Sequence, residues 1–210
     1  MKTFCIALCT MVSLVCHSQS TYDFEDTRKK NEGFAKLPKS DTRADLSTFT
    51  LTGIDEAVGK SELKKIPFSH FGDNFMDFDG DNIKASIRIS PFDKTKHRLD
   101  YDDKYLIKID RRPYYGDYGN IPKTCISNIR VLVDNDTVSI PASAYADLCN
   151  LNFTYTDRGS LRSRNGIYKS KDGHTIYLYL FSKDATGSYE VTWIIQDKKY
   201  LRRVLDYGFM

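Results

Sequence analysis

The residues that could do chemistry are few in this sequence and lie far apart. Beyond residue 18 there are three histidines, His70, His97 and His174, none with another histidine four positions away. No Cys-x-x-Cys pair, Gly-x-Ser-x-Gly elbow or phosphate-binding glycine loop occurs, so the local motifs of zinc, serine-hydrolase and nucleotide sites are missing. We therefore expect no cofactor and no metal, and we favour a non-enzymatic function.

Three aspartates have the spacing that begins a calcium-binding loop. Asp77, Asp79 and Asp81 occupy its first, third and fifth positions, but Asn82 stands where the loop needs glycine. Arg88 stands where the loop needs a bidentate carboxylate. We therefore interpret this stretch as an acidic, well-solvated turn rather than a calcium site.

A pair of carboxylates brought together only by the fold would leave no local motif, so a small secreted hydrolase remains the alternative function. Such a pair needs two acids in unlike environments, one to donate a proton and one to accept it. A solvated charged surface explains the same residues equally well. The acids concerned are Asp100, Asp102, Asp103, Asp110 and Asp117.

The stretch 113–120, Pro-Tyr-Tyr-Gly-Asp-Tyr-Gly-Asn, is the best candidate for recognition. Tyr114, Tyr115 and Tyr118 offer flat apolar faces with polar ends, which suit stacking on sugars or anchoring a protein partner. Loop tyrosines also commonly fold back to seal the end of a β-sandwich, and this packing role is the commoner one. Both roles are open for these three residues.

Two cysteines, Cys125 and Cys149, lie beyond residue 18. An even number in an exported chain favours a disulfide between them. The alternative is two separate buried thiols, because spacing alone does not establish that they are close.

The first eighteen residues have the pattern of a signal peptide. Lys2 precedes an apolar run over residues 4–15 that is too short to span a bilayer, and a small-x-small cleavage site follows. We expect export to a periplasm or the extracellular space, with no transmembrane segment. A lipid anchor at Cys16 is not expected, because residues 13–15 lack the small residue usual before such a cysteine. Residues 19–46 are polar and without period, which predicts a flexible tail.

Residues 47–210 are expected to form one β-rich domain. The sequence 79–82, Asp-Gly-Asp-Asn, predicts a tight turn, and residues 83–90 after it alternate apolar and polar. Residues 174–181 are apolar on both faces of a strand, which predicts cover on both faces. In residues 188–196 the face carrying Glu190 is expected to be partly exposed. We also expect a first strand at 49–52, and in total about eight or nine short strands with one or two short helices.

The predicted fold is therefore all-β, an antiparallel β-sandwich or a half-open barrel. The 31 Lys and Arg residues nearly balance the 28 Asp and Glu residues, which argues against a nucleic-acid partner. We expect an exported, non-enzymatic protein that binds a protein or glycan partner with loops at one end of the sandwich. Inhibitors, immunity-type proteins and envelope modules all fit this description.

Overall fold

The fold was analysed in a computed structural model that describes residues 32–56, 58–183 and 187–208. Two five-stranded antiparallel sheets face each other, which confirms the predicted sandwich. The expected signal peptide and Cys16 lie outside the described residues. The first sheet, sheet A, has the order β1-β11-β12-β13-β14. Its strands are β1 (Lys64–Ile66), β11 (Gly166–Lys169), β12 (Thr175–Lys183), β13 (Ser188–Gln196) and β14 (Lys199–Tyr207).

The second sheet, sheet B, has the order β2-β3-β4-β7-β8, and the chain passes into it from sheet A at Pro67. Its strands are β2 (Phe68–Gly72), β3 (Phe75–Gly80), β4 (Ile83–Pro91), β7 (Thr124–Val133) and β8 (Asp136–Val138). Two separate hairpins pair β5 (Leu99–Asp102) with β6 (Tyr105–Ile109), and β9 (Tyr155–Asp157) with β10 (Ser160–Arg162). The described residues thus form fourteen strands, more than the eight or nine expected.

Two-residue turns join several of the long strands. Asp81 and Asn82, between β3 and β4, both have positive φ, at 53° and 59°. This conformation matches the right-handed twist of a hairpin, and aspartate and asparagine tolerate it better than most residues. The predicted turn at this position is therefore formed, and β3 precedes it.

Apolar side chains from the facing surfaces of the two sheets form the main core. Trp193 and Leu178 of sheet A are fully buried with Met76 and Ile87 of sheet B. Their positions follow the two-residue alternation of a strand, which places every second side chain on the inner face. Burial of these side chains supplies the main driving force that holds the sheets together.

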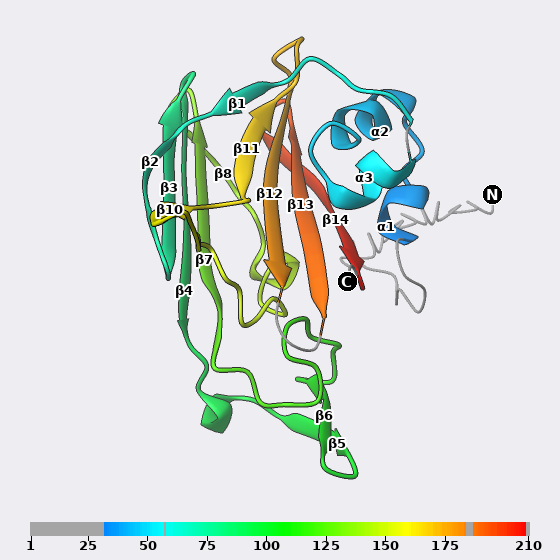
Figure 1. The fold of residues 1–210 in the computed structure, drawn as a ribbon, viewed down its shortest axis with the longest axis vertical. Helices are drawn as coiled ribbons and strands as arrows, with labels where there is room; N and C mark the ends of the chain where they lie inside the picture. The colour runs from blue at the N-terminus through cyan, green and yellow to red at the C-terminus, as the bar shows by residue number, and fades with distance from the viewer. Residues whose placement is uncertain (1–31, 57, 184–186, 209–210) are drawn as a thin grey trace, which may run out of the picture.

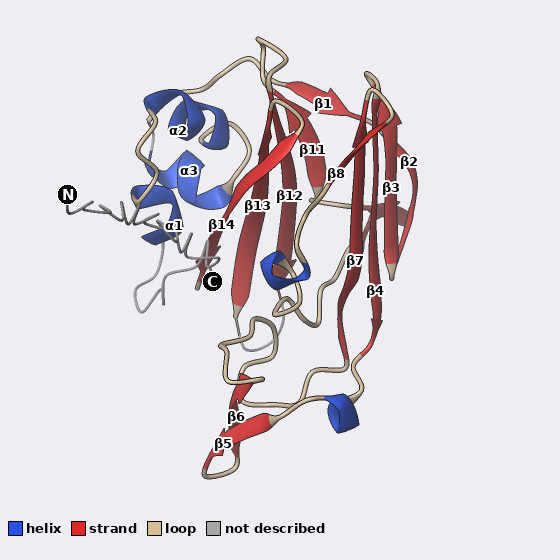
Figure 2. Cartoon of the chain, turned by 180° about the vertical axis from the view of Figure 1, so that it is seen from behind, coloured by secondary structure: helices blue, strands red, loops and turns tan. Residues whose placement is uncertain are grey.

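A layer of short helices covers the outer face of sheet A, so the molecule has three layers (Figures 1 and 2). The helices are α1 (Glu32–Ala35), α2 (Ser40–Leu46) and α3 (Leu51–Glu56). Phe34, Leu37 and Leu46 form a second apolar cluster with side chains of β12, β13 and β14. The helices thus cover the outer face of the strand predicted at 174–181, which is apolar on both faces.

The helical layer corrects three predictions. The flexible tail expected over 19–46 is wrong for residues 32–46, whose apolar side chains pack on sheet A. The strand expected at 49–52 is also wrong, because α3 starts at Leu51. Glu190, expected on a partly exposed face, is buried beneath the helices.

Candidate binding site at one end of the sandwich

One end of the sandwich carries most of the residues singled out from the sequence. The β5–β6 hairpin projects beyond the sheets there, at the bottom of Figures 1 and 2. Beside it lie the loop 110–123 and the short 3-10 helix η2 (Ala142–Ala144), and another 3-10 helix, η1 (Lys94–Lys96), precedes the hairpin. We call residues 97–123 and 141–149 the hairpin end.

A tight turn at Asp110 and Arg111 fixes the base of the hairpin. Both residues have positive φ, at 51° and 66°, and Ile109 and Arg112 exchange backbone hydrogen bonds of 2.9 and 3.0 Å across them. The Asp110 carboxylate accepts hydrogen bonds from His97 Nδ1 at 2.7 Å and from the Arg98 backbone N–H at 2.8 Å. The bond from His97, followed by that from Arg98, lowers the pKa of Asp110, so this carboxylate is ionised and orients the His97 ring.

A cleft of about 590 Å³ opens between the base of the hairpin and η2. This volume lies within the usual size of small-molecule sites, roughly 300–1,000 Å³. Both apolar and charged side chains contribute to its walls. The lining residues are His97, Lys108, Ile109, Asp110, Arg112, Pro113, Tyr114, Ser143, Ala146, Asp147 and Arg203.

The floor of the cleft is held by a buried ion pair. Arg203 of β14 donates to both carboxylate oxygens of Asp147, at 2.6 and 2.7 Å, and to the Ala144 carbonyl at 2.9 Å. Its side chain is only 2% exposed. Trp193 Nε1 donates to the same carbonyl at 2.9 Å. Bidentate arginine pairs have a fixed geometry, so sheet A holds η2 and Asp147 in place.

The disulfide between Cys125 and Cys149 is present, and it ties the start of β7 to the segment that follows η2. Backbone hydrogen bonds continue the connection on either side, from Ile126 N to the Leu148 carbonyl and from Asn150 N to the Thr124 carbonyl. This crosslink therefore supports the floor of the cleft from the side of sheet B.

The three tyrosines of the loop have different environments. Tyr114 is buried, and its hydroxyl donates to the Asn120 carbonyl at 2.8 Å and accepts from the Gly119 N–H at 3.1 Å. Burial raises the pKa of Tyr114 to about 12. Tyr115 is half-buried against Tyr189. These two side chains pack the end of the sandwich, whereas Tyr118 is 64% exposed.

Two further exposed tyrosines lie on the hairpin, and the sequence analysis missed them. Tyr101 and Tyr105 flank the β5–β6 turn and are 48% and 53% exposed. Leu106 N donates to the Gly119 carbonyl, so the strand after Tyr105 lies against the segment that carries Tyr118. The sequence did contain a signal for them, because one tyrosine stands on each side of the polar turn Asp-Asp-Lys at 102–104. The hairpin end thus presents three exposed aromatic rings, none of which lines the cleft.

The acids considered for a hydrolase do not gather in one place. Asp110 lines the cleft, whereas Asp102 and Asp103 lie at the turn of the hairpin and are exposed. Asp100 pairs with the Arg98 guanidinium at 2.8 Å. Asp117 accepts a hydrogen bond from the side chain of Asn120. The second carboxylate of the cleft is Asp147, which the sequence analysis did not single out.

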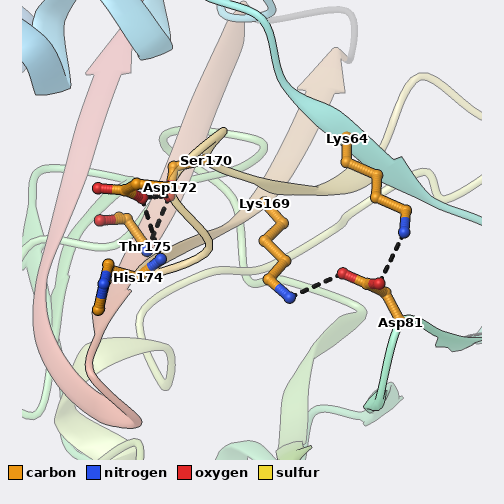
Figure 3. A network of polar contacts seen from close by, with 7 residues as sticks. All are labelled: Lys64, Asp81, Lys169, Ser170, Asp172, His174 and Thr175. Atoms are coloured by element: carbon orange, nitrogen blue, oxygen red, sulfur yellow. Dashed lines mark hydrogen bonds and ion pairs between the residues drawn. The ribbon is translucent and has the colours of Figure 1, made fainter.

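The acids considered for calcium form ion pairs instead. Figure 3 shows Asp81, in the β3–β4 turn, between Lys64 of β1 and Lys169 of β11, at 2.6 and 2.8 Å. Hydrogen bonds from Lys169 and Lys64 lower the pKa of Asp81. Asp77 pairs with Arg88 at 2.7 Å. Asp81 thus links the two sheets at the end opposite the hairpin. Within residues 32–56, 58–183 and 187–208, no three acids, histidines or cysteines are close enough to hold a metal ion.

Two buried carboxylates anchor the helical layer. Glu190 accepts hydrogen bonds from the Leu51 and Thr52 N–H groups at the start of α3, at 2.7 and 2.9 Å. Asp206, directly opposite it on β14, accepts from the Gly33 and Phe34 N–H groups of α1, at 2.7 and 3.1 Å. These are the N–H groups that a helix leaves without internal partners. Burial raises the pKa of both carboxyl groups, that of Asp206 to about 6.

Comparison with protein-family models, curated proteins and solved structures finds no match to this chain. The described part of the chain contains no helix long and apolar enough to cross a membrane.

Proposed function

We propose that this is an exported, non-enzymatic β-sandwich protein that binds a protein or glycan partner at its hairpin end. The observation that carries the proposal is the group of exposed tyrosines, Tyr101, Tyr105 and Tyr118, beside a cleft. Tyrosine rings provide large, fairly rigid contact areas with polar ends, which is why they are enriched where proteins bind partners.

The support beneath these residues favours binding. The Asp147–Arg203 ion pair, the disulfide and the Tyr114 hydrogen bonds all hold the hairpin end in one conformation. A surface that is already ordered loses less conformational entropy when a partner binds.

The carboxylates favour binding over hydrolysis. A general acid needs a raised pKa, but the pKa of Asp110 is lowered. Both carboxylate oxygens of Asp147 accept hydrogen bonds from Arg203, which favours the ionised form over a proton donor. The acids with raised pKa values, Glu190 and Asp206, are buried beneath the helices and hold helix N-termini. Export is supported by the pattern of residues 1–18 and by the disulfide.

Affinity capture with matched variants tests the proposal. The wild-type protein, the variant Tyr105→Ala/Tyr118→Ala and a control are immobilised and exposed to envelope and extracellular fractions at low and high salt. The control is Tyr155→Ala/Leu161→Ala, which removes one tyrosine and one apolar side chain that are similarly exposed on β9 and β10. We expect both variants to melt at the wild-type temperature, because the replaced side chains are exposed.

A partner retained at high salt by the wild type and the control, and lost by Tyr105→Ala/Tyr118→Ala, is the expected result. Retention by all three proteins would show that the partner binds elsewhere. Failure of every fraction to provide a retained protein or glycan would count against a binding function.

A further inference from the structure

The cleft at the hairpin end contains cations that its own acids do not balance. Lys108, Arg112 and Arg203 line it together with two carboxylates, Asp110 and Asp147. Arg203 and Asp147 neutralise each other in the bidentate pair. Arg112 helps to keep Asp110 ionised. Lys108 lies opposite Asp100, which pairs with Arg98, and Lys108 itself forms no ion pair within the described ranges. The lining therefore carries about one surplus positive charge, at the Lys108 side of the cleft.

The same cleft offers both donors and acceptors of hydrogen bonds. His97 Nδ1 is hydrogen-bonded to Asp110, so Nε2 is the ring nitrogen available to a ligand. Ser143 adds a hydroxyl group. The Asp110 oxygens each have a further lone pair beyond the bonds from His97 and Arg98. A ligand that uses these acceptors must itself donate, as sugar hydroxyl groups do.

Size and surroundings also suit a sugar. Ile109, Pro113 and Ala146 give the cleft apolar surface against which the C–H groups of a sugar ring can pack. Exposed aromatic rings at Tyr105 and Tyr118 lie on the adjoining hairpin and loop, where neighbouring sugars of a chain could stack.

We propose that the cleft binds an acidic sugar, with the sugar carboxylate at Lys108 and its hydroxyl groups at His97, Ser143 and Asp110. A single surplus charge matches a singly charged carboxylate better than a phosphate, which carries up to two charges at neutral pH. An acidic peptide offers only its backbone N–H groups as donors to Asp110, whereas a sugar ring offers several hydroxyl groups close to its carboxylate. This inference rests on the proposed function and specifies the glycan form of it.

Titration followed by two-dimensional NMR tests the inference directly. The probes are sodium glucuronate, methyl glucuronide, glucose, glutamate and inorganic phosphate, each added to the full protein. The variants are Lys108→Gln and the matched control Lys104→Gln, which removes an equal charge from the turn of the same hairpin, outside the cleft lining. Both lysines are exposed, so we expect both variants to fold.

We expect glucuronate and methyl glucuronide to shift the resonances of residues 97, 108–113 and 143–147. Loss of one charge-assisted contact in Lys108→Gln is expected to weaken binding about tenfold. Lys104→Gln should bind as the wild type does. Glucose binding as tightly as glucuronate would overturn the role of the carboxylate, and tighter binding of glutamate or phosphate would overturn the acidic sugar.

No shift with any probe would overturn the inference but not the proposed function. That function fails only if the capture experiment finds no partner that depends on Tyr105 and Tyr118, so the two failures can be distinguished.

Discussion

Raising the pH from about 4.5 to 7.5 should weaken the fold through Asp206. Its pKa is raised from 3.8 to about 6, first by burial and then by the charge of Glu190 opposite, against the lowering effect of the N–H groups of Gly33 and Phe34. The native protein therefore holds a proton over a range in which the unfolded chain has released it. Stability from this group is fully present below pH 3.8 and is lost as the pH rises through about 6.

The size of this loss follows from the shift. About two pKa units correspond to about 3 kcal/mol in the free energy of unfolding. About 2 kcal/mol of this is lost between pH 4.5 and 7.5, because the unfolded chain has already released most of this proton at pH 4.5. Asp206 is only 3% exposed, so solvent screens the effect little. Glu190, whose pKa burial also raises, acts in the same direction.

Urea unfolding followed by fluorescence measures the effect, because Trp193 is the only tryptophan and is fully buried. The variant Asp206→Asn cannot ionise, so its stability should change less with pH over this range. His174 also has a raised pKa, because it is hydrogen-bonded to Asp197. Its contribution to the stability of the fold is therefore also lost as the pH rises. Introducing His174→Gln into both the wild type and Asp206→Asn separates the effect of His174 from that of Asp206.

Carboxylates with lowered pKa values, such as Asp81 and Asp110, weaken the fold only when acid protonates them. Their effect therefore falls mostly below the chosen range. Wild-type stability that stays constant or rises from pH 4.5 to 7.5, or an unchanged slope in Asp206→Asn, would refute this explanation of the helical layer.

Three further predictions concern the hairpin end. Replacing Cys125 and Cys149 by serine should lower the free energy of unfolding by about 3 kcal/mol, and equal urea midpoints for variant and wild type would contradict this. Arg203→Met leaves Asp147, whose side chain is 15% exposed, without its partner and should cost about 3 kcal/mol in the same assay, whereas a loss below about 1 kcal/mol would show that the pair matters little. Tyr114→Phe leaves the Gly119 N–H without its acceptor and should cost about 1–3 kcal/mol. An unchanged thermal midpoint would show that the hydrogen bonds of the Tyr114 hydroxyl add little to stability.

The sandwich was predictable because its evidence is local. Alternation over 83–90 and the Asp-Gly-Asp-Asn turn each act over a few residues, and both lead to elements that the structure contains. The disulfide followed from the cysteine count once the expected signal peptide was set aside.

The helical layer could not be predicted in the same way. Helices of four to seven residues are too short to show a helical period, and their polar composition resembles that of a tail. Glu190 illustrates the consequence. A glutamate on an alternating strand normally faces water, but here it faces the N-terminus of α3, which only the tertiary structure brings to it.

The cleft could not be predicted from the sequence either. Its lining comes from residues 97, 108–110, 112–114, 143, 146–147 and 203, which no local motif connects. The tyrosine loop was found, but only Tyr118 of its three tyrosines is exposed, and Tyr101 and Tyr105 replace the other two as candidates. Alternation alone does not indicate which side of a projecting hairpin meets solvent.

Hydrogen–deuterium exchange of the protein with and without its captured partner tests the central claim most directly. If the hairpin end is the binding surface, protection should appear in residues 97–123 and 141–149 and be absent from β9 and β10. Protection confined to the helices α1–α3, to β14 or to the turn at Asp81 would contradict the claim.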